Sequence, residues 1–163
     1  MKRLILMRHA KSDWSEGPSS DHDRPLNARG RQAATALGDW LRDHDVLPDQ
    51  MLSSSAARTK ETFERLELPT QTEVSFLRPL YLASEDTILN TLKTAQGDTV
   101  LMIGHNPGIA MMAQGICTKA PDHPHFMPYP TGATLVAEFD IDEWSNATWG
   151  KANARHFTVP RDF

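Results

Sequence analysis

The sequence places two histidines and two arginines where they could act together on a phosphate group. Arg8 and His9 follow the first apolar run of the chain, Arg58 lies early in a segment of helical pattern, and His105 follows the clearest strand pattern, residues 99–103. Guanidinium groups pair with phosphate oxygens through charge-assisted hydrogen bonds. A neutral imidazole, with a reference pKa of about 6.5, is a nucleophile at neutral pH, and a second, protonated imidazole donates to oxygens as charge develops. The set indicates phosphoryl transfer with His9 as the nucleophile.

Three further residues stand next to these histidines. Asn106 follows His105 and precedes Pro107, a pair typical of the N-cap and first position of a helix. Free backbone N–H groups at such a helix start bind anions, so we expect Asn106 to contribute to substrate binding. Lys11 and Ser12 are near enough to the nucleophile to touch a phosphate, and the residues leave their role open.

Alternating strand and helix patterns are expected to position these side chains. The strands predicted from apolar runs are residues 4–7, 50–53, 73–77, 99–103, 133–139 and 156–159. The predicted helices are 27–44, 54–66 with its serines as the cap, 84–95, and a segment ending near residue 117, and a polar loop is predicted over 13–25. This alternation is typical of an α/β fold, here a three-layer α/β/α sandwich with a mostly parallel sheet. Ligands bind at the carboxyl edge of such a sheet, where His9, Arg58 and His105 should converge.

Composition narrows the partners and the location. The chain has 17 Lys and Arg against 21 Asp and Glu, a net charge of −4, which argues against nucleic acid as a partner. No apolar stretch approaches the roughly 18 residues of a membrane span. The single cysteine, Cys117, excludes an internal disulfide and favours a cytoplasmic protein, and we interpret it as core packing. The length of 163 residues suits one domain, 1–163, without an insertion long enough for a separate cap, so the site should be shallow and open.

Four segments resemble motifs of the histidine phosphatase superfamily, the clan of phosphoglycerate mutases and acid phosphatases. They occur in family order: residues 6–12 resemble its RHG box, 24–30 its R-P-L-T-x-x-G helix entry, 53–62 its S-x-x-x-R-x-x-x-T segment aligned on Ser54, Arg58 and Thr62, and 103–108 its second-histidine box. Ala10 replaces the glycine of the first box, as is common in the short phosphohistidine phosphatase branch of SixA type.

The resemblance implies a phosphoglycerate mutase-like fold and a role for each matching residue. His9 would become the phosphohistidine intermediate, Arg8 and Arg58 would clamp the phosphoryl oxygens, and His105 would complete the pocket. Arg24 would add positive charge from the loop. The family needs no metal and no organic cofactor, and the pair His123 and His125, with no thiolate nearby, is not expected to bind zinc either.

The sequence departs from the family pattern where many members carry a proton-donating acid. After the third strand it has no acid until Glu85 and Asp86, and Tyr81 is interpreted as a packing residue. An alkoxide leaving group needs a positioned acid, whereas an imidazole, with a conjugate-acid pKa of about 6.5, leaves with little help. We therefore expect a phosphatase that acts on phosphohistidine of a phosphorylated protein.

Two alternatives stay open: a small-molecule phosphate monoester phosphatase of the same fold, with Glu85 or Asp86 as its acid, and a non-catalytic phosphate-binding domain. A monomer is the favoured state, and the residues leave the oligomeric state and the physiological pathway open.

Overall fold

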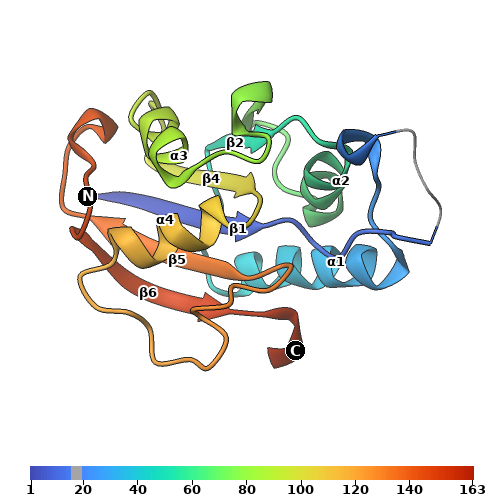
Figure 1. Ribbon diagram of the computed structural model, residues 1–163. Coiled ribbons are helices and arrows are strands. Elements are labelled where there is room, and N and C mark those ends of the chain that lie inside the picture. The colour runs from blue at the N-terminus through green and yellow to red at the C-terminus, as the bar shows by residue number, and fades with distance from the viewer. Residues whose placement is uncertain (16–19) are drawn as a thin grey trace.

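The computed structural model describes residues 1–15 and 20–163, which form a sheet of six strands with helices on both faces (Figure 1). The elements are, in chain order, β1 (Lys2–Arg8), α1 (Ala28–Asp43), β2 (Gln50–Ser54), α2 (Ala57–Leu66), β3 (Glu73–Leu77), α3 (Glu85–Leu92), β4 (Thr99–Gly104), α4 (Gly108–Ile116), β5 (Thr134–Phe139) and β6 (Ala152–Thr158). The predicted three-layer α/β fold is confirmed. Part of the loop predicted over 13–25, residues 16–19, lies outside the described residues.

The sheet is parallel in its first four strands and antiparallel in its last two. The strand order is β3-β2-β4-β1-β5-β6, and β5 runs against β1 while β6 runs against β5. After α4 the chain returns through an irregular, proline-rich stretch to the carboxyl edge of the sheet, where Gly132 donates its N–H to the backbone oxygen of His9. Because β5 starts at that edge, it must run in the opposite direction.

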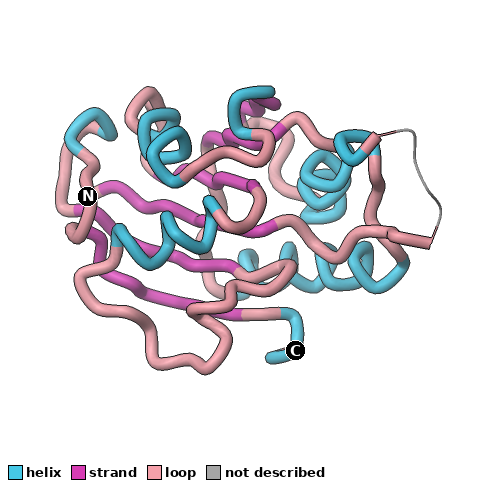
Figure 2. The backbone as a smooth tube through the Cα atoms, in the orientation of Figure 1, coloured by secondary structure: helices cyan, strands magenta, loops and turns pink. Residues whose placement is uncertain are grey.

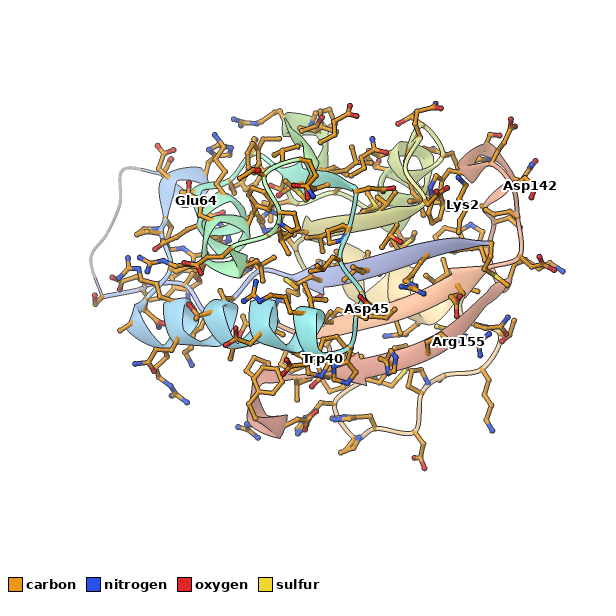
Figure 3. The ribbon with its side chains drawn as sticks, turned by 180° about the vertical axis from the view of Figure 1, so that it is seen from behind. Lys2, Trp40, Asp45, Glu64, Asp142 and Arg155 are labelled. Atoms are coloured by element: carbon orange, nitrogen blue, oxygen red, sulfur yellow. The ribbon has the colours of Figure 1, made fainter. Side chains whose placement is uncertain are left out.

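The apolar run of β1 is buried on both of its faces. Leu4 and Leu6 pack in a core cluster with α3 and α4, whereas Ile5 and Met7 pack on the other face with α1 and α2. A strand that is buried on both faces has a continuous run of apolar residues, and this run allowed β1 to be predicted from the sequence. Figure 1 shows α4 in front of the sheet, and Figure 3, the reverse view, shows α1 on the other face with Trp40 near its end.

The fold creates a crevice at the carboxyl ends of two neighbouring strands. β1 and β4 pair in parallel, but the chain leaves β1 toward α1 on one face and leaves β4 toward α4 on the other. Loops that diverge in this way open a space between them, the usual ligand site of open α/β sheets. Figure 2 shows both loops at the same end of the sheet. His9 and His105 lie directly after these two strands.

Two helix starts and one strand differ from the sequence prediction. α2 begins at Ala57 without a side-chain cap, because Ser54 belongs to β2 and its hydroxyl is engaged elsewhere. α4 begins after Pro107, so Asn106 is not its N-cap. β6 begins four residues before the predicted 156–159, because it is an edge strand whose exposed residues break the apolar pattern. In the described part of the chain, no helix is long and apolar enough to cross a membrane.

Candidate active site

A cavity of about 510 Å³ lies at the carboxyl edge of the sheet and contains every site residue predicted from the sequence. Its walls come from the loops after β1, β2, β3 and β4 and from the segment before β5. The lining residues are Arg8, His9, Lys11, Ser12, Trp14, Asp21, Arg24, Arg58, Leu82, His105, Asn106 and Thr131. The structure therefore brings Arg8, His9, Arg24, Arg58, His105 and Asn106 together, and it adds Lys11 and Ser12, whose position the sequence left open.

His9 is held with one ring nitrogen committed and the other available. Its Nδ1 lies 2.7 Å from the backbone oxygen of Ala10, and because a carbonyl only accepts, Nδ1 carries the proton and donates it. The lone pair of the neutral ring is then on Nε2. The backbone is fixed as well: the N–H of His9 donates to the oxygen of Gly104 at 3.1 Å, and the N–H of Ala10 donates to Oγ1 of Thr62 at 3.0 Å. This is the tautomer that a nucleophilic imidazole requires.

The ring of His105 faces that of His9, with the two centroids 5.3 Å apart. Nε2 of His105 lies 2.8 Å from Oγ of Ser54. The same hydroxyl oxygen accepts the N–H of Ala56, so its own proton is free to be donated to Nε2. In the tautomer in which Oγ of Ser54 donates to Nε2, His105 carries its proton on Nδ1, which is buried and has no hydrogen-bond partner among the described residues. A neutral His105 can thus still donate one hydrogen bond.

Both histidines are held neutral. Burial above all, together with the positive charges of Arg8 and Arg58, lowers the pKa of His9 to about 3. Burial and the Arg58 guanidinium likewise lower the pKa of His105 to about 3. The expectation that the second imidazole is protonated was therefore wrong for the free protein, because burial above all, and the positive charge of Arg58 after it, disfavour the protonated ring. Neutral His9 is the form with a lone pair available for attack.

Arg58 and Arg24 are held together by a carboxylate that sequence reasoning missed. Arg58 is 3% exposed, and its guanidinium donates to the backbone oxygen of Asp21 at 2.8 Å and to Oδ2 of Asp21 at 3.0 Å. The other carboxylate oxygen, Oδ1, accepts from Arg24 at 2.8 Å, and Arg24 also donates to Oγ of Ser12. One carboxylate in the loop before α1 therefore orients both guanidinium groups toward the cavity.

Tyr81 completes this group. Its hydroxyl donates to Oδ2 of Asp21 at 2.5 Å, so Tyr81 does more than the packing role assigned to it. The Tyr81 hydroxyl and Arg24 hold the pKa of Asp21 well below its usual range. Asp21 is therefore ionised at neutral pH. The only sequence signal for Asp21 was a carboxylate three residues before Arg24 in a polar loop, the spacing of a single turn.

Arg8 and Asn106 share an anchor in the segment before β5. Nη1 of Arg8 donates to the backbone oxygen of Tyr129 at 3.3 Å, and the amide nitrogen of Asn106 donates to the same oxygen at 3.0 Å. Tyr129 is fully buried and its hydroxyl donates to the backbone oxygen of Leu6 at 2.6 Å. Asn106 thus positions the wall of the cavity beside Arg8 rather than capping a helix.

The loop after His9 packs tightly on the start of α1. A Cβ atom at Gly30 would overlap the backbone oxygen of Lys11, so only glycine permits this approach. The side chain of Asn27 caps the helix by accepting the N–H of Gly30 at 2.8 Å, and the N–H of Asn27 donates to Lys11 at 3.0 Å. The residues next to the nucleophile are therefore fixed by α1 as well as by the sheet.

Four buried donors in this cavity have no hydrogen-bond partner among the described residues: Nε of Arg8, Arg24 and Arg58, and Nδ1 of His105. Buried N–H groups are almost always paired, so a cluster of unpaired donors indicates a bound acceptor. An oxyanion with several acceptor oxygens, such as a phosphoryl group, satisfies such a cluster. Within the described residues, no group of three His, Cys, Asp or Glu side chains is arranged to hold a metal ion.

Neither acid considered as a proton donor lines the cavity. Glu85 and Asp86 form the first turn of α3, and the only carboxylate among the lining residues that the structure describes is Asp21. A group that is ionised at neutral pH has no proton to give. Among the residues that the structure describes, the arrangement thus offers a nucleophile and several cations, with no protonated acid lining the cavity.

Comparison with known proteins points to one family. A family model described as the histidine phosphatase superfamily (branch 1) matches residues 4–80. An uncharacterised chloroplastic protein of Arabidopsis thaliana is 33% identical over 134 residues, 72% of this chain and 62% of that protein, so the chain spans less than two thirds of that relative's length. The phosphohistidine phosphatase SixA of Escherichia coli K12 is 26% identical over 153 residues, covering 90% of both proteins. A solved structure assigned as phosphohistidine phosphatase SixA, from Nakamurella multipartitia, superimposes with a TM-score of 0.86 at 28% identity, covering 98% of this chain and 96% of that one.

Proposed function

The chain belongs to the histidine phosphatase superfamily and is a phosphatase, and we propose that it hydrolyses phosphohistidine on proteins. The observation that carries the substrate class is the charge state of the cavity. Asp21, the one carboxylate among the described residues that line it, is held ionised by Tyr81 and Arg24, so none of these residues is an acid ready to protonate an alkoxide. An imidazole leaving group makes no such demand, because its conjugate-acid pKa is about 6.5.

The geometry supports a two-step reaction. The substrate ring reacts in the form that is protonated on its second nitrogen. Nε2 of His9 attacks phosphorus, the bond from phosphorus to the substrate ring breaks, and the substrate leaves as a neutral imidazole that keeps that proton. The proton stays on Nδ1 and is donated to the backbone oxygen of Ala10. This hydrogen bond stabilises the positive charge that the His9 ring gains. Water then attacks the phosphoenzyme, phosphate leaves with the oxygen of that water, and His9 is neutral again.

Electrostatic stabilisation comes from groups that are already in place. Arg8, Arg58 and His105 line the cavity and carry buried nitrogens without a partner among the described residues, so they can stabilise the spread charge of the phosphoryl oxygens in both steps. Arg24, tied to Arg58 through Asp21, adds positive charge at the edge of the cavity. Positioning and electrostatics supply most of the catalysis in phosphoryl transfer, so no metal is required by this scheme.

The rim of the cavity supports a protein substrate. Trp14 and Leu82 line it and are 76% and 56% exposed. Large apolar side chains at the edge of a polar site suit contact with another protein surface better than contact with a small sugar phosphate. As part of the same proposal the chain acts as a single domain with no cap over the cavity, in a reducing compartment such as the cytoplasm, where Cys117 stays a thiol.

The test is to trap the intermediate and compare leaving groups. With labelled phosphoramidate, the wild-type protein should form an acid-labile phosphoenzyme that His9→Ala does not form, whereas His156→Ala, an exposed histidine on β6, should form it normally. A chelator should leave the rate unchanged. Phosphoramidate and phosphohistidine should be hydrolysed much faster than alkyl phosphates. Faster hydrolysis of alkyl phosphates, lost in Glu85→Gln or Asp86→Asn, would instead identify a small-molecule phosphatase.

A further inference from the structure

A second cavity, of about 380 Å³, opens beside the candidate active site and carries only basic charge. Among its lining residues are Lys11, Arg29, His125 and Arg161, which we call the basic groove, and none of the lining residues is acidic. It shares Lys11 and Thr131 with the catalytic cavity, so the two are neighbours. The whole chain has a net charge of −4, so an excess of basic residues in the chain does not explain this local cluster of cations.

The cations of the basic groove are not used inside the protein. Lys11, Arg29 and Arg161 are exposed, and none of them forms an ion pair with an acid in the part of the chain that the structure describes. The nearest acid in sequence, Asp162, is engaged elsewhere: its Oδ2 accepts from His123 at 3.0 Å and from the N–H of Val159 at 3.1 Å. The positive charge of the groove thus remains available to an external anion.

The position of Arg29 is unfavourable for the protein on its own. Arg29 lies in the first turn of α1, which contains no acidic residue, although the positive end of a helix favours acids and disfavours cations. Arg161 lies in the C-terminal turn, beside α1 (Figure 1). Two segments far apart in the sequence therefore place arginines along one groove where neither is needed for packing. An acidic ligand would offset the repulsion at Arg29 and pair with Arg161 as well.

We propose that the basic groove docks an acidic surface next to the phosphohistidine of the substrate protein. This inference rests on the proposed function, because the phosphohistidine must enter the catalytic cavity. When it does, the residues that flank it on the partner lie beside the groove, because Lys11 and Thr131 line both cavities. Carboxylates on the partner then face Arg29 and Arg161. Charge complementarity of this kind raises the association rate and excludes partners with a basic face.

The experiment uses two synthetic peptides, each with one phosphohistidine, flanked by Asp and Glu in one and by Asn and Gln in the other. The wild-type protein should favour the acidic peptide in kcat/KM by about tenfold at low ionic strength, and added salt should reduce that preference. The double variant R29E/R161E should lose the preference and keep its rate on phosphoramidate, which is too small to reach the groove. K151E, an exposed lysine at the opposite end of β6, should behave as wild type.

A binding measurement separates this inference from the proposed function. Fluorescence anisotropy with the unphosphorylated acidic peptide should show binding that R29E/R161E weakens about tenfold and K151E does not. If R29E/R161E binds this peptide and selects the acidic substrate as well as wild type does, the docking proposal is wrong. If wild type binds the acidic peptide but hydrolyses neither phosphopeptide, the groove stands and the phosphohistidine substrate is wrong.

Discussion

Asp21 and Arg58 form an ion pair across the candidate active site, with Oδ2 of the carboxylate 3.0 Å from Nη2 of the guanidinium. The same carboxylate binds Arg24 at 2.8 Å, so one negative charge is shared by two cations that would face a phosphoryl group. This carboxylate both orients the guanidinium groups and repels the incoming anion. The effect of a substitution at Asp21 on phosphate affinity therefore depends on which of these two effects is larger.

Asp21→Asn should tighten the binding of phosphate. A unit charge removed from the neighbourhood of a dianion is worth about 1 kcal/mol in water-like surroundings, roughly a factor of five in affinity. The amide oxygen still accepts from Arg58, so the orientation of Arg58 is retained, whereas the amide nitrogen can no longer accept from Arg24. The inhibition constants of phosphate and vanadate measured against phosphoramidate hydrolysis give the comparison, with Asp23→Asn, an exposed acid in the same turn, as the control. Weaker binding in Asp21→Asn would mean that its role is to hold Arg58 in place.

Ser54→Ala should lower kcat roughly tenfold with little change in KM, because the donor is misoriented rather than removed. The Ser54 hydroxyl lies 2.8 Å from Nε2 of His105 and holds the ring in its orientation. Ser53→Ala is a matched control, since Ser53 is as buried as Ser54 but donates only to a backbone oxygen. Equal losses of kcat in the two variants would contradict a role for Ser54 in orienting His105.

Thr62→Val should destabilise the protein by about 1–3 kcal/mol and also reduce activity. Thr62 is fully buried, accepts the N–H of Ala10 at 3.0 Å and donates to the backbone oxygen of Arg58 at 2.7 Å. Valine leaves the N–H of Ala10 without a partner next to the nucleophile. Urea unfolding measures the change, and Thr35→Val, an exposed threonine with the corresponding helix bond, should cost less than about 0.5 kcal/mol.

The stability of the free protein should fall as the pH falls from about 6.5 toward 3. His9 and His105 have a folded-state pKa of about 3, whereas in the unfolded chain it returns to about 6.5. In this window the unfolded state binds more protons, so protonation favours unfolding, by up to about 1.4 kcal/mol per pH unit for each histidine. Urea unfolding at about pH 7 and about pH 5 should show a smaller loss for His9→Gln and for His105→Gln than for wild type. Parallel losses in all three proteins would mean that these histidines are not held neutral.

The residues that the sequence identified are those directly attached to strand ends. Arg8 and His9 follow β1 and His105 follows β4, so the sheet itself determines where they lie, and apolar runs buried on both faces made those strands visible. Arg58 lies in the first turns of α2, one short connection after β2. The positions of such residues can be predicted from the local sequence pattern, because no long loop separates them from the sheet.

The residues that the sequence did not identify act through loops that fold back from a distance. Asp21 reaches Arg58 across 37 positions, and the backbone of Tyr129 reaches Arg8 across 121. Neither contact leaves a periodic pattern, since each depends on the path of an irregular segment. The basic groove is hidden for the same reason, because Arg29 and Arg161 meet only through the packing of the C-terminal turn beside α1. Charge states were missed as well, since they depend on burial.

The strand that carries the nucleophile is bonded along both edges, by β4 on one side and β5 on the other. The bonding continues past its end, where Arg8 and His9 donate to Ala133 at 3.0 Å and to Gly104 at 3.1 Å. The imidazole of this protein is therefore attached to backbone that does not swing outward to meet a partner. Any conformational change needed for contact must therefore occur in the substrate protein, whose phosphohistidine must lie on a protruding or flexible segment. Proteins whose phosphohistidine is recessed should not be dephosphorylated.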